Sequence, residues 1–227
     1  MNRKYYIFLF LCIVAVATLT YYGINTNKER EVSYYVIKET SSCMAECEEG
    51  VKEIYTKYYS TEESEGVRAT FSETSGSETI GGYNIAYLFS RKIIGYSFDR
   101  EGELKYKTVT TSDPGYFLWN LDSMEVGQKW EGNVTIKSDN IKNKENFITE
   151  YKFETEIVSY EKVKIEAGSL NCYKVRCAMS TEYEGEIVKQ INTLWYSPEL
   201  KIIVKGINTT NFKGEECAST SELIEYR

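Results

Sequence analysis

Two cysteines, Cys172 and Cys177, stand five residues apart at the end of the stretch VKIEAGSLNCYKVRC, in a chain that contains no histidine. Paired thiols can form a metal site, a redox pair or a disulfide. This stretch alternates like a β-strand, so the two side chains point to opposite faces and lie roughly 16 Å apart at about 3.3 Å per residue. A disulfide needs Cα atoms within about 7 Å. We therefore predict that these cysteines neither bridge each other nor share a metal ion.

The remaining cysteines have other candidate partners. If the last four strands form an up-and-down meander, alternate turns lie at the same end of the sheet. The turn near Gly185 and the loop that contains Cys217 then share one end, and Cys177 lies nearer to that end than Cys172 does. This favours a disulfide between Cys177 and Cys217. Cys43 and Cys47, at positions i and i+4, are a second candidate disulfide. Five cysteines follow residue 27, so at least one lacks an intramolecular partner. We interpret it as a buried, inert thiol, with an intermolecular bridge as the alternative.

The missing histidines exclude several chemistries. They leave no Ser-His-Asp or Cys-His nucleophile pair, no HExxH zinc site and no imidazole base. The spacing of Cys43 and Cys47 is not the C-x-x-C of thiol oxidoreductases. The acidic run Asp99–Glu103 places Gly102 fourth, whereas a calcium loop needs glycine sixth, so we interpret it as a hairpin turn. We predict no catalytic, cofactor-binding or metal-binding residues.

The amino-terminal sequence predicts that the rest of the chain lies outside the cytoplasm. Residues Tyr5–Ile24 carry no charge and follow two basic residues, which predicts a transmembrane helix that anchors the chain with its carboxyl end outside. A cleaved signal peptide, giving a secreted protein, is the alternative. Cys12 lacks the small residues that precede a lipidated cysteine. We divide the chain into a membrane anchor (1–27), a linker with the first strand (28–40) and an extracytoplasmic β domain (41–227).

The charge of the exported part excludes one class of partner. The first 27 residues hold two of the 27 basic side chains and none of the 34 acidic ones, which leaves 25 basic against 34 acidic and a net charge of −9. Binding to phosphate backbones needs concentrated positive charge. We therefore predict no nucleic-acid partner.

The exported part follows the period of β-strands. In Phe147–Val158, odd positions are mostly apolar or aromatic and even positions mostly charged, as in an antiparallel strand with one buried face. Only two short stretches, Ser42–Glu49 and Phe117–Met124, favour helix. We predict a mainly β fold: one antiparallel, strongly curved sheet or half-open barrel of about ten strands, preceded by the transmembrane helix.

Two sequons, at Asn133 and Asn208, could accept glycans in an organism that glycosylates exported proteins. Asn133 is expected to begin a strand, and Asn208 is expected in a loop, where it would be the more accessible of the two.

Three segments in order, EVGQKW, VKIEAGSLNCYKV and LWYSPELKIIVK, resemble a broad group of exported β proteins of unknown function, over about Gly81–Arg227. The resemblance implies a curved, lipoprotein-carrier-like sheet and assigns no catalytic residue. The shared residues have structural roles: a turn that tolerates positive φ, a proline that ends a strand, and aromatic core anchors. They are Gly127, Trp130, Ala167, Gly168, Tyr173, Trp195, Tyr196 and Pro198.

These observations favour a domain without enzymatic activity that binds an apolar or amphipathic, lipid-like ligand, or an envelope partner protein, on the concave face of its sheet. A purely structural cell-surface interaction module is the alternative. A histidine-free, carboxylate-based hydrolase is the third class, and it would need two convergent acids roughly 5–9.5 Å apart.

Overall fold

The computed structural model describes residues 34–43, 52–62, 68–76, 82–89, 92–99, 101–113, 124–141, 144–183, 185–212 and 215–227. All regular secondary structure in these ranges is β-strand. The strands are β1 (Tyr34–Cys43), β2 (Lys52–Glu62), β3 (Arg68–Gly76), β4 (Gly82–Phe89), β5 (Lys92–Asp99), β6 (Leu104–Asp113), β7 (Lys129–Asn140), β8 (Glu145–Ile165), β9 (Gly168–Tyr183), β10 (Glu186–Ser197), β11 (Ile202–Phe212) and β12 (Glu215–Tyr226).

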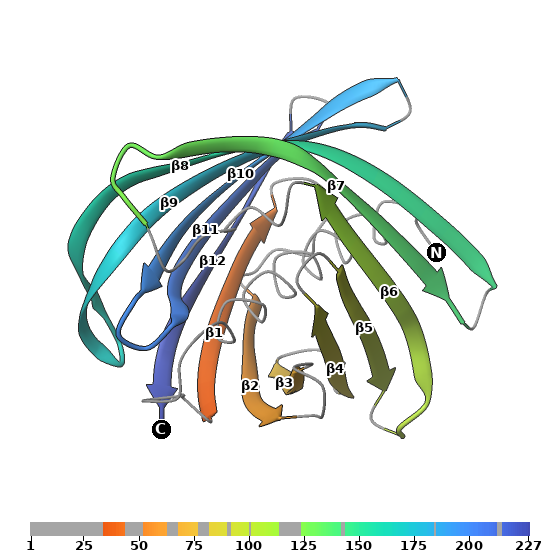
Figure 1. Ribbon diagram of the computed structural model, residues 1–227. Coiled ribbons are helices and arrows are strands. Elements are labelled where there is room, and N and C mark those ends of the chain that lie inside the picture. The colour runs from red at the N-terminus through yellow and green to blue at the C-terminus, as the bar shows by residue number, and fades with distance from the viewer. Residues whose placement is uncertain are drawn as a thin grey trace.

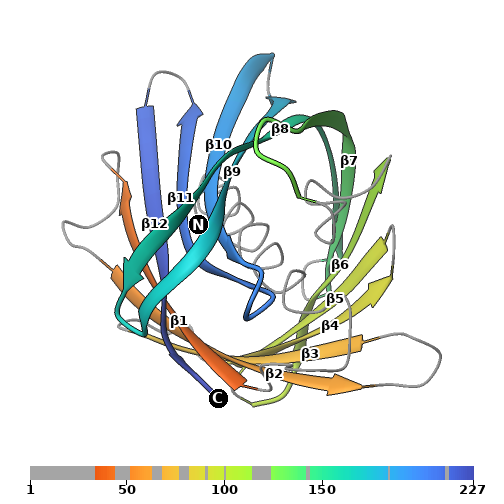
Figure 2. The same cartoon turned by 60° about the vertical axis from the view of Figure 1, so that its left-hand side comes forward.

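The strands form one antiparallel sheet in which chain neighbours pair (Figure 1). β1 also pairs with β12, so the pairing continues round a closed barrel (Figure 2). The prediction of a mainly β fold built on one curved antiparallel sheet is confirmed. The sequence indicated about ten strands and a half-open sheet, whereas the described part of the chain has twelve strands in a ring. Closure depends on pairing between the two ends of the domain, which local alternation does not encode.

β8 shows why these sequences form strands with one buried face. Its side chains at positions 151, 153, 155 and 157 are buried, and those at 150, 152, 154 and 156 face outward with intermediate or full exposure. This agrees with the predicted alternation. A β-bulge between Ile157 and Ser159 then inserts one extra residue opposite β9, so the later residues Val163 and Ile165 turn to the other face.

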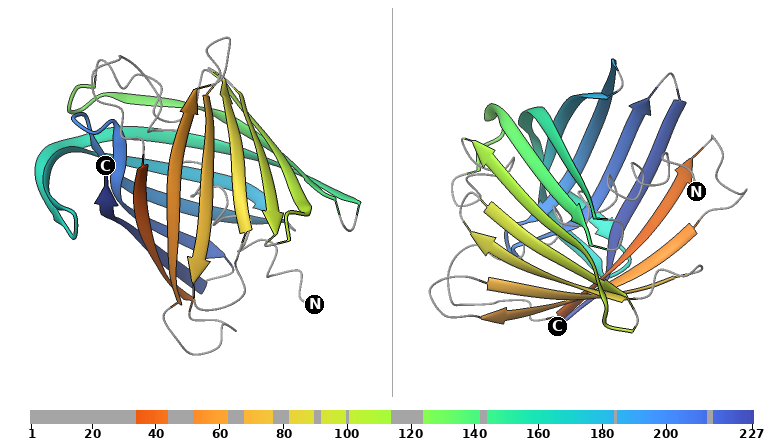
Figure 3. Two further views of the ribbon diagram at one scale, coloured as in Figure 1. Left: turned by 90° about the horizontal axis from the view of Figure 1, so that it is seen from below. Right: turned by 90° about the vertical axis from the view of Figure 1, so that its right-hand side faces the viewer.

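Beyond the bulge, the end of the β8–β9 hairpin curls back toward β12, as the view from below shows (Figure 3). The Ala167 N–H donates to the Leu223 carbonyl oxygen at 3.3 Å, and the Glu166 N–H donates to a Glu222 carboxylate oxygen at 2.7 Å. We call residues 159–173 the hairpin tip. Its apolar side chains join a core cluster with strands that are distant in the sequence.

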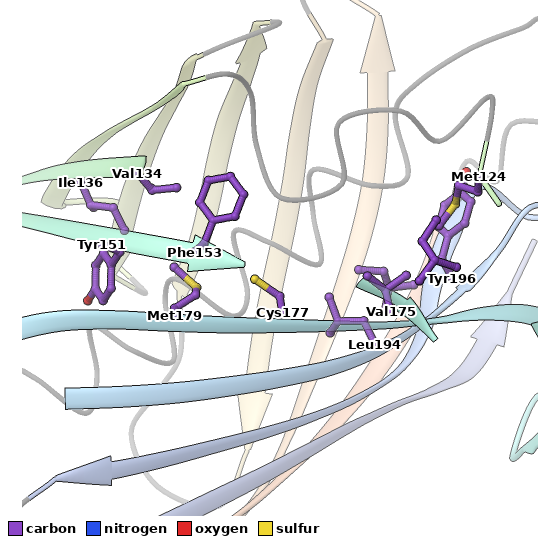
Figure 4. Close-up of a cluster of buried hydrophobic side chains, with 12 residues drawn as sticks. Met124, Val134, Ile136, Tyr151, Phe153, Val175, Cys177, Met179, Leu194 and Tyr196 are labelled. Atoms are coloured by element: carbon purple, nitrogen blue, oxygen red, sulfur yellow. The ribbon is translucent and has the colours of Figure 1, made fainter. Parts of the chain in front are cut away.

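Two apolar clusters form the core, one on each side of β9. The first cluster lies along the inner face of β7–β10 (Figure 4), and the second lies where the hairpin tip meets β1, β11 and β12. The first contains Met124, Val134, Ile136, Tyr151, Phe153, Ile157, Val175, Cys177, Met179, Leu194, Tyr196 and Ile203. The second contains Tyr35, Ile37, Tyr58, Val163, Ile165, Leu170, Cys172, Trp195, Leu200, Ile202, Val204 and Leu223.

Several predictions for the amino-terminal part lie outside the described residues, among them the transmembrane helix. In the ranges given above, no helix has the length and apolar character needed to span a bilayer. The predicted helix Ser42–Glu49 is wrong at its start, because residues 42 and 43 belong to β1, and its remainder lies outside the described part. The predicted helix Phe117–Met124 lies outside it too, except for Met124, which is buried in the first cluster without regular secondary structure.

Candidate functional site

A groove of about 890 Å³ crosses the outer face of strands β7–β10. It is hollow because β9 places the short side chains of Ala178 and Ser180 between longer ones, which come from the neighbouring strands and from Arg176 of β9 itself. Glu154 of β8 and Ile191 of β10 flank Ala178 in the ladders. The groove spans three strand spacings, or about 14 Å. We call it the outer groove.

Charges of both signs line the outer groove in bands. Glu131 and Glu154 stand directly opposite each other on β7 and β8 and form an acidic band. Two residues further along each strand, Lys152 and Lys189 flank Ser180 and form a basic band. Like charges placed directly opposite each other across a ladder repel, so the acidic band costs stability in the isolated domain.

These groove charges are not neutralised by the domain itself. Among the described residues, Glu131, Glu154, Lys152, Arg176 and Lys189 form no ion pair. At the groove end, by contrast, Lys129 pairs with Glu156 at 3.2 Å. The outer groove thus combines an apolar floor with five charges that are available to a bound molecule.

The inner face of the sheet differs in character. The first apolar cluster points inward from β7–β10, as Figure 4 shows for Phe153, Met179 and Leu194. Polar groups interrupt it: Gln190 is 2% exposed, and its Nε2 donates to Asn192 Oδ1 at 3.3 Å while its Oε1 has no hydrogen-bond partner. A buried acceptor without a partner costs roughly 1–3 kcal/mol.

A second unsatisfied acceptor lies on β1. Glu39 Oε1 is inaccessible and has no hydrogen-bond partner, and burial raises the pKa of this carboxyl from 4.5 to about 7. Burial, and then the neighbouring Glu39 charge, raise the pKa of the Tyr58 hydroxyl far above its usual value. Tyr58 stacks on Tyr35, with ring centroids 4.5 Å apart. Among the residues that the structure describes, none forms an ion pair with Glu39.

The two cysteines of β9 lie as predicted. Cys172 belongs to the second cluster and Cys177 to the first, on opposite faces, and both thiols are free. Burial raises the pKa of Cys177 to about 12, and burial together with the Glu161 charge raises that of Cys172 to about 11. Both remain protonated at neutral pH, and the thiol is far less nucleophilic than the thiolate.

The predicted disulfide between Cys177 and Cys217 is wrong. Cys217 is a free thiol, and strands β10 and β11 separate it from Cys177. Three strand spacings are about 14 Å, twice the Cα separation that a disulfide tolerates. The prediction rested on the end of the sheet at which each cysteine was expected, although the two strands were not expected to be neighbours. The pairing of Cys43 with Cys47 lies outside the described residues, because Cys47 is not among them.

The glycines and the proline of the sequence motif take the expected structural places. Gly127 has φ of +91° in the turn before β7, and its N–H donates to the Ile157 carbonyl oxygen at 2.7 Å. Gly168 has φ of +136° just after Ala167 in the β8–β9 turn. Pro198 directly follows β10 and so ends that strand.

The aromatic motif residues anchor both clusters. Trp130 packs against the first cluster, as does Tyr173, and Tyr196 is a buried member of it. Trp195 is 8% exposed in the second cluster, and its Nε1 donates to Glu161 Oε1 at 2.8 Å. This hydrogen bond, followed by one from Ser159, holds the pKa of Glu161 below its usual value.

The two sequons lie on strands. Asn133 is exposed on β7, at the edge of the outer groove. Asn208 lies within β11, opposite Asn192 and Ser219, so its predicted loop position is wrong. β11 continues past Asn208 to Phe212 and β12 begins at Glu215, so most of the residues that follow Asn208 belong to paired strands.

Sequence reasoning missed the outer groove. The period of β8 identified Glu154 as an outward residue, but the groove exists only because Glu154 aligns with Ala178 and then Ile191. That alignment is a property of register across strands. No group of three acidic or cysteine side chains suited to a metal ion occurs in the described ranges. The predicted hairpin turn at Asp99 is confirmed, with Gly102 at φ of +83°.

No family model matches the sequence, and no curated relative matches it. Among solved structures, the chain is similar to an exported protein with a YmcC-like fold from Bacteroides fragilis, at 16% identity and a TM-score of 0.50, over 90% of this chain and 98% of that one. It is also similar to a lipoprotein from Parabacteroides distasonis (15%, TM-score 0.47, 87% and 96%) and to the lipoprotein YmcC from Escherichia coli (9%, TM-score 0.46, 88% and 92%). The Bacteroides fragilis structure supports a YmcC-like fold for this chain.

Proposed function

We propose that this chain is an exported, membrane-attached β domain that binds an extended segment of a partner protein in the outer groove and catalyses no reaction. The segment carries a basic side chain that meets Glu131 and Glu154, and acidic side chains that meet Lys152 and Lys189. The single observation that supports this proposal is a groove of about 890 Å³ whose charged residues have no ion-pair partner in the described part of the domain.

The shape and charge of the groove favour a peptide over a compact ligand. The groove lies open on a sheet face, so it can receive a chain across several strands. Pockets for small molecules are mostly concave and apolar with a few polar groups. The outer groove carries more charge than such pockets do, because five charged side chains surround an apolar floor that includes Ala178. Paired charges at such a surface give specificity and faster association.

The proposed location rests on the sequence of residues 1–27 and on the fold shared with an exported protein. Protease treatment of intact cells that express the full chain tests it. Digestion of the domain in intact cells supports an outward-facing domain, and protection until the cells are lysed contradicts it.

Photo-crosslinking tests the partner proposal. A benzophenone amino acid at Ile191 lies in the groove, and the same substitution at Ile187 is its matched control. Both isoleucines are exposed on the outer face of β10, but Ile187 lies outside the groove. In cells that express the full chain, we expect a discrete adduct from position 191 and none of that mass from position 187. Equal adducts at both positions would contradict the proposal.

A second candidate is an amphipathic ligand on the inner face. The observation that favours it is that two inaccessible acceptors have no hydrogen-bond partner, Gln190 Oε1 among the residues of the first apolar cluster and Glu39 Oε1 on β1. A ligand head group with hydroxyl or amine donors would satisfy them. Native mass spectrometry of the full chain, beside the same sample denatured, tests this candidate. A mass excess that disappears on denaturation supports it, and the bare chain mass contradicts it.

A further inference from the structure

The closure between the first and last strands places two cysteines directly opposite each other. In the β1–β12 ladder, Cys43 is the register partner of Cys217, and the preceding partners, Ser42 with Ala218 and Ser41 with Ser219, follow without a break. The only irregularity of this ladder lies near its other end, between Val36 and Ile37. Cys43 and Cys217 are thus partners in a regular antiparallel stretch.

We propose that Cys43 and Cys217 form a disulfide that joins β1 to β12. Directly opposed residues in an antiparallel pair have Cα atoms about 4.5 or 5.5 Å apart, depending on whether the pair is hydrogen-bonded. Both values fall in the range of about 4.4–6.8 Å that disulfides occupy. The Cβ atoms of directly opposed residues also lie on the same face of a sheet. Neither Cys172 nor Cys177 is a register partner of another cysteine.

Accessibility separates Cys217 from the thiols of β9. Cys217 is partly exposed and free, whereas Cys172 and Cys177 are fully buried. An oxidant can therefore reach Cys217 in the folded domain. The reaction is thiol–disulfide exchange with a low-molecular-weight or protein disulfide: the two thiols lose two protons and two electrons, and the oxidant disulfide is reduced to two thiols.

The disulfide would join the two strands, β1 and β12, whose pairing closes the barrel. All other pairings join strands that are consecutive in the sequence, whereas β1 and β12 come from opposite ends of the domain. Linking residues 43 and 217 closes a loop that contains most of the domain. Such long-range links restrict the unfolded chain most strongly in the chain-entropy view. The disulfide thus stabilises barrel closure, independently of any bound partner.

Peptide mapping of the full chain tests this proposal. The purified, reduced protein is oxidised with glutathione disulfide, remaining thiols are alkylated, and the protein is digested with an enzyme that cleaves after glutamate. Cleavage after Glu46 separates Cys43 from Cys47, which is the competing thiol. We expect a linked pair of peptides that contain Cys43 and Cys217, about 2 Da lighter than the sum of the two peptides. Alkylated Cys217, or a link from Cys43 to Cys47, would overturn the proposal.

A stability measurement complements the mapping. Reduction of the oxidised protein is expected to lower its Tm by about 5–15 °C. Cys47→Ser is the matched control and should retain this shift, whereas Cys43→Ser and Cys217→Ser should abolish it. The same Tm before and after reduction, in protein whose oxidised state carries the link, would show that the link does not stabilise barrel closure.

Discussion

At the scale of single residues, Glu39 gives the domain a pH dependence of unusual sign. Burial raises the pKa of its carboxyl from 4.5 to about 7, so the folded chain holds the proton more tightly than the unfolded chain does. Its contribution to stability is fully present below about pH 4.5 and is lost as the pH rises through 7. Oε1 is inaccessible, but the side chain as a whole is only partly buried. We therefore expect the free energy of unfolding to fall by about 1–2 kcal/mol, which is less than the whole pKa shift would give.

Glu39→Gln should remove this loss, because the amide does not ionise. Urea unfolding at pH 4.5 and pH 8 measures it: the variant should gain about 1–2 kcal/mol over the natural chain at pH 8 and little at pH 4.5. Glu150→Gln, on the exposed face of β8, is the control and should follow the natural chain. A variant with the same pH slope as the natural chain would rule out Glu39 as its source.

Gly168 is a second residue whose effect on stability follows from its backbone conformation. Its φ of +136° lies in a region that side-chain-bearing residues rarely adopt, although a Cβ there would meet no atom within 4 Å. Gly168→Ala is therefore expected to cost about 1–3 kcal/mol through backbone strain alone. The urea midpoint measures the cost, with Ser169→Ala at the exposed next position as the control. Equal midpoints for the two variants would refute the strain argument.

At the scale of elements, the hairpin tip is held by its apolar side chains and by a few hydrogen bonds to β12. Ile165 is 5% exposed in the second cluster, and its neighbour Ala167 donates to Leu223. Ile165→Ala should cost about 2–5 kcal/mol through lost burial and the cavity it leaves. It should also speed amide exchange at the tip.

Hydrogen-exchange mass spectrometry of peptides across residues 163–170 measures the second effect. Lys164→Ala changes an exposed side chain on the same strand and serves as the control. If Ile165→Ala lowers stability but leaves exchange at the tip unchanged relative to the rest of the sheet, the tip is held by its backbone bonds instead.

Elements also show what the sequence can predict. The alternation of β8, the turn at Gly168 and the end of β10 at Pro198 are local properties; the first was predicted from the period of the residues, and the other two from the shared motifs. The bulge after Ile157 was not predicted, because it changes which face is buried without changing the residue types. The pairing of Cys177 with Cys217 failed for a related reason, since two strands that look close in a meander diagram are separated by others.

At the scale of the whole molecule, the features that matter most are set by register. The sheet closes because β1 pairs with β12, and the outer groove exists because Ala178 and Ser180 align between longer side chains. A single sequence lists these residues but does not say which of them become neighbours. The outer groove was therefore not predicted from the sequence, although the sequence contains all of its charged residues.

If the charges of the outer groove bind a partner segment, reversing one of them should prevent binding. Photo-crosslinking from Ile191 is repeated in chains that carry Glu154→Lys, which reverses the acidic band, or Glu150→Lys, an outward position on the same strand that does not line the groove. We expect the adduct to disappear with Glu154→Lys and to persist with Glu150→Lys. An adduct of unchanged yield in the Glu154→Lys chain would contradict the proposal.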